Sequence, residues 1–210
     1  MCTETFLRLP EEKRNRFLDA AWEEFTTVSF SDVSINKIIR RAGIPRGSFY
    51  QYFTDKNDLF SYLLTDVRLR AVQLFTDLLD QAGGDPFAVQ MMAYDHFISR
   101  RSSPTPTLDR CIRLVRLNIG MDMERAISTQ PEGERMLESL CPKLDTSVLK
   151  QRNPEFALRT FSMATMLMGS AMMDTLCHPE RGEENRRELE ARLEIIKCGS
   201  LRADCLIKPE

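Results

Sequence analysis

The chain has 210 residues, of which 42% are hydrophobic and 29% are charged, and its formal net charge is −2. This length accommodates a small domain beside a larger one, and the near-balanced charge excludes a protein that coats nucleic acid through bulk positive charge. A local basic face remains compatible with it.

The beginning of the chain and its cysteines bear on where the protein resides. The first ten residues lack a basic start followed by an apolar run, so no signal peptide is expected. The longest uncharged stretch, 160–173, is shorter than the ~20 residues that a membrane helix needs. Six widely spaced cysteines without a CxxC pair do not predict a disulfide framework. We therefore expect a cytoplasmic protein without a membrane segment.

The first helix is predicted over Pro10–Val28. Pro10 with Glu11 and Glu12 suits a first turn, where the helix dipole favours carboxylates. An apolar stripe then recurs at helical spacing: Phe17, Ala20, Ala21, Phe25 and Val28. This helix is expected to lie across the back of the next two, with Phe30 filling the gap between them.

Residues 34–53 contain two short helical patterns joined by a glycine turn. Ser34 is expected to cap the first helix with its hydroxyl, and Gly43 to end it in a left-handed conformation. Pro45 can open a second helix over Arg46–Tyr52, which turns Phe49 and Phe53 inward. Two short helices joined in this way predict a helix-turn-helix.

The surface of this helix-turn-helix is rich in cations and hydrogen-bonding tips. Between Asn36 and Phe53 there are four positive residues and no negative one: Lys37, Arg40, Arg41 and Arg46. The second helix adds further polar tips at Ser48, Tyr50, Gln51 and Tyr52. DNA binders need cations for phosphate and side chains that bond base edges. A solvated basic face is the alternative, and the agreement of turn, cap and polar tips favours DNA.

The rest of the chain predicts helices only. Start and stop signals place them over 56–81, 87–100, 108–128, short pieces within 132–152 around Pro142, 154–177 and 183–198. Gly83-Gly84-Asp85-Pro86 and Asn153-Pro154 mark helix starts with a capping residue before proline. No strand pattern, internal repeat or low-complexity segment is present. The prediction is an all-α protein of about nine helices.

The stretch from Phe17 to Phe60 resembles the DNA-binding domain of the TetR family of bacterial transcription regulators. The matching residues are Phe17-Leu18-Asp19-Ala20-Ala21, Phe25, Ile38, Ala42-Gly43-Ile44, Gly47-Ser48-Phe49-Tyr50-Gln51-Tyr52-Phe53, Lys56 and Leu59. Two positions depart from the usual pattern, since Ile39 replaces a common Ala and Pro45 a capping Ser. The resemblance implies a DNA-binding domain over 1–56 and a helical effector-binding and dimerisation domain over 57–210.

The resemblance also implies roles for individual residues. Base-facing positions match Asn36, Arg46, Gly47 and Gln51. Phosphate-holding positions match Ser34, Ser48, Tyr50, Tyr52 and Lys56. The expected partner is double-stranded DNA with a palindromic operator. The expected function is that of a homodimeric regulator, usually a repressor, that a small-molecule effector releases.

The resemblance implies that the last two predicted helices of the second domain form the dimer interface. Candidate interface residues are Met163, Met166, Gly169, Met173, Leu189 and Leu193, although 154–177 is also apolar enough to be an ordinary core helix. Candidate effector-lining residues are Met91, Met92, Tyr94, Phe97, Met121 and Met123, with His96 as a polar contact. Plain core packing is the alternative for each.

Other classes of function have less support. The chain has two histidines, His96 and His178, and no glycine-rich phosphate loop or metal motif, so we expect neither an enzyme nor a cofactor or metal. A redox sensor using Cys111, Cys141 or Cys177, and a helical binding protein without DNA function, remain alternatives. The sequence does not identify the effector, the operator or the regulated genes, and it does not separate repressor from activator.

Overall fold

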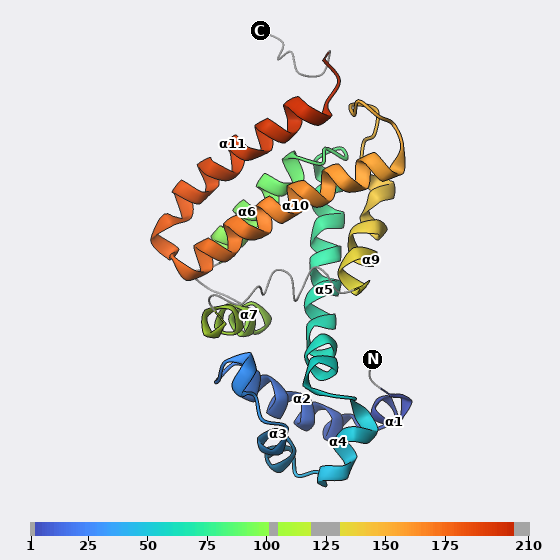
Figure 1. Ribbon diagram of the computed structural model, residues 1–210, viewed down its shortest axis with the longest axis vertical. Helices are drawn as coiled ribbons and strands as arrows, with labels where there is room; N and C mark the ends of the chain where they lie inside the picture. Colours follow the sequence, from blue (N-terminus) through green and yellow to red (C-terminus); the bar gives the residue numbers. More distant parts are fainter. Residues whose placement is uncertain (1–2, 101–104, 119–130, 204–210) are drawn as a thin grey trace. The chain divides into compact units, whose positions relative to one another are not determined.

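The computed structural model describes residues 3–100, 105–118 and 131–203. Within those ranges the structure is almost wholly helical, and its only β pairing is an isolated bridge between Leu149 and Leu201. The α-helices are α1 (Glu4–Leu7), α2 (Glu11–Phe25), α3 (Ile35–Ala42), α4 (Arg46–Tyr52), α5 (Lys56–Gln81), α6 (Ala88–Arg100), α7 (Pro106–Leu117), α9 (Pro131–Leu140), α10 (Pro154–Cys177) and α11 (Gly182–Ser200) (Figure 1). The all-α prediction is confirmed.

In the described part of the chain, three short 3-10 turns accompany these helices. They are η1 (Phe30–Asp32), η2 (Cys141–Lys143) and η3 (Pro179–Arg181). The described residues form two compact units. The first contains the chain up to Leu69 together with 105–118, and the second contains 70–100 with 131–203. Helix α5 therefore contributes its first half to one unit and its second half to the other. The expected functional boundary at residue 56 stays a prediction.

The core of the first unit is a cluster of aromatic rings. Phe6 from α1, Phe17 from α2 and Phe49 from α4 are all fully buried. The rings of Phe17 and Phe53 stack at 5.8 Å, and Phe53 also contacts Phe6 at 4.8 Å. Close aromatic packing of this kind contributes beyond the area it buries. It makes α1, α2 and α4 one rigid block, with Phe49 and Phe53 turned inward as predicted.

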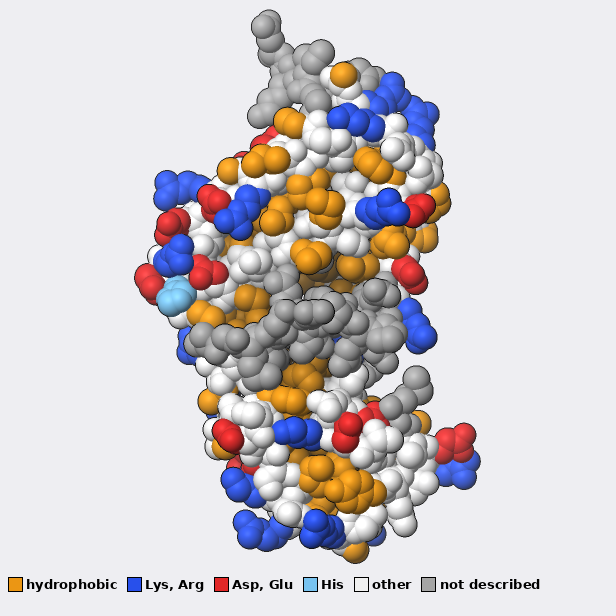
Figure 2. Space-filling view, viewed as in Figure 1, with side chains coloured by type: hydrophobic (Ala, Val, Ile, Leu, Met, Phe, Trp, Pro, Cys, Tyr) orange, Lys and Arg blue, Asp and Glu red, His pale blue; other side chains and the backbone are white. Residues whose placement is uncertain are grey.

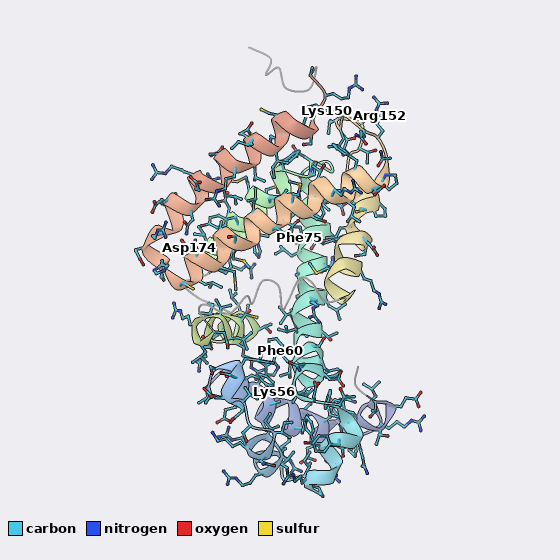
Figure 3. The ribbon with its side chains drawn as sticks, in the orientation of Figure 1. Lys56, Phe60, Phe75, Lys150, Arg152 and Asp174 are labelled. Atoms are coloured by element: carbon cyan, nitrogen blue, oxygen red, sulfur yellow. The ribbon has the colours of Figure 1, made fainter. Side chains whose placement is uncertain are left out.

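The second unit packs α6, α9, α10 and α11 with the second half of α5. Its core includes Leu79, Phe87, Tyr94, Leu140, Phe161, Ala164, Leu189 and Leu193. Phe75 on α5, labelled in Figure 3, meets Phe161 on α10 edge-on. The two ring centroids are 6.2 Å apart. This core draws on helices far apart in the sequence.

A buried polar network joins α6, α10 and α11. The Tyr94 hydroxyl is within 2.6 Å of Thr175 Oγ1 and donates to the Gly182 carbonyl at 2.9 Å. Asn185 Nδ2 lies 2.9 Å from the same Thr175 oxygen and 2.8 Å from Asp174 Oδ2. Because buried polar groups are costly when unpaired, this network fixes the turn between α10 and α11.

Several predicted helix ends are confirmed by their caps. Gly43 has φ of 66° and closes α3, while Asp85 Oδ1 accepts the Phe87 N–H at 2.7 Å. Asn153 Oδ1 accepts the Phe156 N–H at 2.8 Å and opens α10 at Pro154 as predicted. The side chains and left-handed glycines therefore act where local sequence signals placed them.

Other boundaries were predicted wrongly. Helix α2 ends at Phe25 rather than Val28, because Thr26 caps it and bonds its hydroxyl back to the Trp22 carbonyl. Helix α7 begins at Pro106, two residues before the predicted start, because Thr105 caps it. It ends at Leu117, and the rest of the helix predicted to reach Ser128 lies outside the described residues. Helix α1 was not predicted.

Candidate nucleic-acid interface

Helices α3 and α4 present an exposed polar face on the first unit. Asn36 on α3 and Arg46, Gly47 and Gln51 on α4, the residues predicted to face bases, are exposed. A methyl group added at Gly47 would meet no heavy atom within 4 Å, so the backbone there is open to solvent. Lys and Arg side chains gather over α3 and α4 at the lower end of the view (Figure 2).

The apolar side of the same helices explains why this face is outward. Ile38, Ile39 and Ala42 bury one stripe of α3 against the rest of the unit. At the turn, the Ile44 N–H returns to the Ile39 carbonyl at 3.1 Å, which the left-handed Gly43 permits. Pro45 then caps α4. The two helices are thus held by their apolar sides, while their polar side chains lie on the outer side of the unit.

Two of the four cations on this face are already paired. Lys37 Nζ lies 3.7 Å from the buried Glu24 carboxylate, and an Arg41 guanidinium nitrogen lies 2.9 Å from Glu23 Oε1. Both acids belong to α2, outside the sequence window that contains only positive charges. Among the described residues, Arg40 and Arg46 have no carboxylate within salt-bridge distance. The free positive charge of the face therefore concentrates at these two arginines.

The expected cap at Ser34 was wrong. Its hydroxyl makes no capping hydrogen bond to α3. Instead, the Ser34 N–H donates to Glu24 Oε1 at 3.2 Å, so a carboxylate from α2 satisfies the backbone at this helix start. The half-buried Ser34 hydroxyl is left for another partner.

The candidate phosphate residues on α4 differ in exposure. Tyr50 is 58% exposed and Ser48 is half-buried. Tyr52 is only 8% exposed, because its ring packs against Phe6 at 5.6 Å and Phe17 at 6.2 Å. Tyr52 therefore belongs to the core with most of its ring, and a change there would disturb packing as well as any contact.

Lys56 begins α5 and reaches back to η1 (Figure 3). Its Nζ donates to the carbonyls of Phe30 at 2.8 Å and Ser31 at 2.9 Å, and lies 5.0 Å from the centre of the Phe30 ring. An ammonium has three N–H donors, so one is still available for a phosphate. In this structure Lys56 holds a turn.

The candidate effector residues on α6 are largely core residues. Tyr94 is fully buried and hydrogen-bonded, Phe97 is buried, and Met91 packs against the core. His96 is half-buried, and burial, with a smaller contribution from the Arg100 guanidinium, lowers its pKa. Met121 and Met123 lie outside the described residues. A cavity of about 310 Å³ between α2 and α7 and two cavities along α10 and α11 are lined by other residues.

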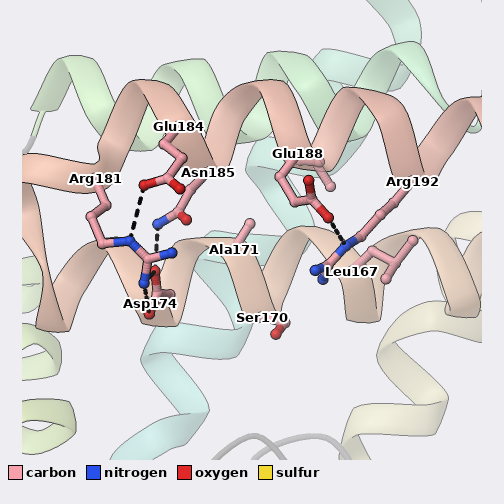
Figure 4. A pocket seen from close by; sticks show the side chains of 10 residues that line it. Leu167, Ser170, Ala171, Asp174, Arg181, Glu184, Asn185, Glu188 and Arg192 are labelled. Carbon is pink, nitrogen blue, oxygen red and sulfur yellow. Dashed lines mark hydrogen bonds and ion pairs between the residues drawn. The ribbon is translucent and has the colours of Figure 1, made fainter.

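Helices α10 and α11 carry an exposed apolar face. Met163 and Met166 are 56% and 58% exposed, and Ile195 on α11 is 73% exposed. Gly169 and Met173 are half-buried beside them. Two hollows of about 350 and 550 Å³ lie along the pair, the first bordered by ion pairs of Arg181 and Arg192 (Figure 4). Leu189 and Leu193 are buried in the core of their own chain.

Four residues contribute to these sites without a signal in the local sequence. Glu23 and Glu24 were treated as part of the first helix, and only the fold shows that they pair with Arg41 and Lys37 of α3. Ile195 sits in a highly charged helix, where its exposure has no local signal. Asn118 fell inside a predicted helix, yet it ends α7 and bonds to Phe30 across 88 residues.

Comparison with known proteins agrees with this arrangement. Residues 17–63 match the family described as bacterial regulatory proteins, tetR family. The chain is 39% identical over 72 residues to the uncharacterized HTH-type transcriptional regulator YdgC of Bacillus subtilis, covering 34% of this chain. It is 33% identical over 79 residues to the HTH-type transcriptional regulator AcrR of Shigella flexneri, covering 38% of this chain. In both cases the match spans 37% of the relative's length.

A solved structure extends the likeness to nearly the whole chain. Native NalD of Pseudomonas aeruginosa, the secondary repressor of the MexAB-OprM multidrug efflux pump, aligns with a TM-score of 0.58 at 24% identity. The alignment covers 92% of this chain and 98% of that one. At this identity the likeness shows the fold. None of the described helices combines the length and apolar character needed to cross a bilayer.

Proposed function

Residues 17–63 form an N-terminal domain of the tetR family of bacterial regulatory proteins, and on that premise we propose that the chain is a homodimeric, sequence-specific DNA-binding transcriptional regulator. Its mode is repression at a palindromic operator, ended by a small-molecule effector. No catalytic step, cofactor or metal is part of this proposal.

The exposed edge of α4 carries the proposal. Arg46 and Gln51 are solvent-exposed, lie on a helix anchored by buried Phe49, and flank a glycine with open space above it. Arg can bond guanine O6 and N7 in bidentate fashion, and Gln can do the same with adenine N6 and N7. Asn36 extends this base-reading set from α3. A rigid helix with such tips suits the major groove.

Phosphate contacts would surround this edge. Tyr50 and Ser48 offer hydroxyls on α4, and Ser34 offers one beside α3. Arg40 is an exposed cation that forms no salt bridge with a carboxylate of the described residues. Lys56 contributes through the ammonium N–H that is not hydrogen-bonded to η1. These contacts fix register on the duplex and make affinity depend on salt. Tyr52 contributes mainly by packing.

Dimerisation is needed because one short helix reads few base pairs. Two copies related by a two-fold axis read a palindrome with half-sites about one helical turn apart. The exposed apolar face of α10 and α11, carried by Met163, Met166 and Ile195, would bury itself against the same face of a second copy. Gly169 and Met173 lie beside it. Leu189 and Leu193 are left out of this interface because they pack inside their own chain.

Sedimentation tests this interface. Met166→Glu with Ile195→Glu places two charges on the exposed face, and the expected result is a monomer at micromolar concentration where the wild type is a dimer. Leu69→Glu is the matched control, since Leu69 is a 64% exposed apolar side chain on α5. It should leave the dimer intact. A wild-type monomer, or a double variant that stays dimeric, would remove α10 and α11 from the interface.

The effector would bind in the second unit and act by linkage. A ligand releases DNA only if it binds the non-binding state more tightly than the binding one. Met91, His96 and Phe97 on α6 remain the proposed contacts, whereas Tyr94 is committed to its buried hydrogen bonds. The chemistry of the ligand stays open.

Redox sensing is the second candidate, and the thiols give it little support. Burial raises the pKa of Cys111 to about 11, and burial together with Glu138 raises the pKa of Cys141. Thiolates are the reactive form, so both cysteines are poor sensors at neutral pH. Among the cysteines that the structure describes, only Cys198 is exposed, and it forms no disulfide bond with the others.

A genomic-fragment selection with purified protein tests the proposed function. The wild type should recover fragments that share a palindrome, and an Arg46→Ala/Gln51→Ala variant should not. These two exposed residues are chosen because their truncation spares the core, unlike truncation of Tyr52. Equal recovery by both proteins would mean that α4 does not read the bases. Absence of any enrichment by the wild type, with and without cell extract as an effector source, would count against DNA binding.

A further inference from the structure

The turn that leads into α3 is held by side chains from three other helices. The polar backbone groups of η1 and of the start of α3 have few partners within their own segment. Phe30 N–H, Phe30 C=O, Ser31 C=O and Ser34 N–H are all bonded to side chains elsewhere in the first unit. Those side chains belong to Asn118, Lys56 and Glu24.

Asn118 is the most distant of these in sequence. It caps the C-terminus of α7, is 3% exposed, and lies 88 residues beyond its partner. Its Oδ1 accepts the Phe30 N–H at 2.8 Å, while its Nδ2 donates to the Leu114 carbonyl of its own helix at 2.7 Å. The second bond orients the amide so that the oxygen faces η1. Asn118 therefore ties the end of α7 to this turn.

Lys56 bonds the other backbone polar group of the same residue, the Phe30 carbonyl. Its ammonium bonds the Phe30 and Ser31 carbonyls, as described above. The Phe30 ring lies between the rings of Phe25 and Phe60, with centroid distances of 5.9 Å and 5.2 Å. Figure 3 labels Phe60 and Lys56. Helix α7 therefore holds the N–H of Phe30, α5 holds its carbonyl, and α2 and α5 together hold its ring.

The position of Phe30 fixes the start of α3. Only Val33 separates η1 from Ser34, and Asn36 follows in the first turn of the helix. A displaced η1 would carry Ser34 and Asn36 with it. We propose that Asn118 is a positioning residue for DNA binding, acting on α3 through the Phe30 amide. This inference rests on the proposed function for its effect on DNA, although the positioning itself concerns the free protein.

Asn118 supplies hydrogen-bond partners for polar backbone groups inside the first unit. Truncation of Asn118 would leave the Phe30 N–H and the Leu114 carbonyl without their partner, and buried groups left unpaired lose more than the net value of one hydrogen bond. The rest of η1 would remain anchored by Lys56. We therefore expect local loosening, with α2 and α4 retained by their aromatic core.

Hydrogen exchange in the free protein is the first arm of the test. In the wild type the Phe30 amide should exchange at least tenfold more slowly than the Ser31 amide of the same turn. In Asn118→Ala this protection should be lost at Phe30 and reduced at Ser34. Asn118→Asp, which keeps an acceptor oxygen, should retain protection at Phe30. An unprotected wild-type Phe30 amide overturns the inference even if Asn118→Ala does not fold.

Operator binding is the second arm. Asn118→Ala should weaken affinity about five- to tenfold, the range expected for a lost buried hydrogen bond, and Asn118→Asp should restore part of it. Arg113→Ala on the exposed side of α7 is the matched control and should bind like the wild type. Wild-type affinity in Asn118→Ala overturns the inference. If the wild type itself binds no DNA, the proposed function fails, and the exchange data alone decide whether Asn118 positions the turn.

Discussion

Gly47→Ala should raise stability while lowering affinity for DNA. Gly47 is the second residue of α4, and a Cβ placed there meets no atom within 4 Å. Alanine is preferred over glycine in helices by up to ~1 kcal/mol, and it restricts the unfolded chain. Because the position lies in the first turn, we expect a gain of about 0.5 kcal/mol in the free energy of unfolding.

The added methyl group would point away from the protein, toward the side of α4 on which we propose that the bases lie. Glycine allows a backbone to approach a ligand closely, and the added Cβ would hold α4 away from the groove. We expect operator affinity to fall about tenfold, which corresponds to roughly 1.4 kcal/mol, comparable with one mismatched base pair.

Urea unfolding and fluorescence anisotropy on a labelled operator measure the two effects separately. Gly199→Ala is the matched control, because Gly199 lies near the end of α11 and also has open space around it. It should bind operator like the wild type. Unchanged affinity in Gly47→Ala would refute the reasoning, since it would mean that DNA does not approach this edge of α4.

Two further predictions concern the second unit and the thiols. Tyr94→Phe removes the hydrogen bonds to Thr175 and Gly182 in a fully buried site. The free energy of unfolding, measured by urea titration at fixed protein concentration, should fall by about 2 kcal/mol. A loss below about 0.5 kcal/mol would count against the network. At pH 8, three units below its pKa of about 11, only about one Cys111 thiol in a thousand is ionised. Site-resolved alkylation should therefore modify exposed Cys198 first and reach Cys111 only as pH approaches 11. Rapid labelling of Cys111 at pH 8 would contradict its burial.

Local signals predicted most of the fold. The left-handed Gly43, the cap at Asp85 and the cap-then-proline at Asn153 each act within a few residues of where they stand. Such signals depend on backbone geometry and nearest neighbours, which a sequence states directly. Helix existence and the helix-turn-helix could therefore be predicted in advance.

The interactions between helices could not be predicted in the same way. Glu24 neutralises Lys37 and bonds Ser34, although a window from Asn36 to Phe53 contains no acid. Tyr52 has a polar tip, yet its ring is drawn into the aromatic core. Asn118 reaches Phe30 only because α7 packs in the first unit. Each of these depends on which helix faces which, and periodicity does not specify that.

The base preference of Arg46→Ala shows whether α4 reads bases. Operators carrying each single base-pair change would be titrated with the wild type, with Arg46→Ala and with Arg40→Ala, an exposed cation on α3 as control. We expect Arg46→Ala to lose its preference between base pairs, worth about 1–3 kcal/mol, at one position in each half-site. Arg40→Ala should lower the affinity for all operators alike. An unchanged preference profile in Arg46→Ala would contradict base reading by α4.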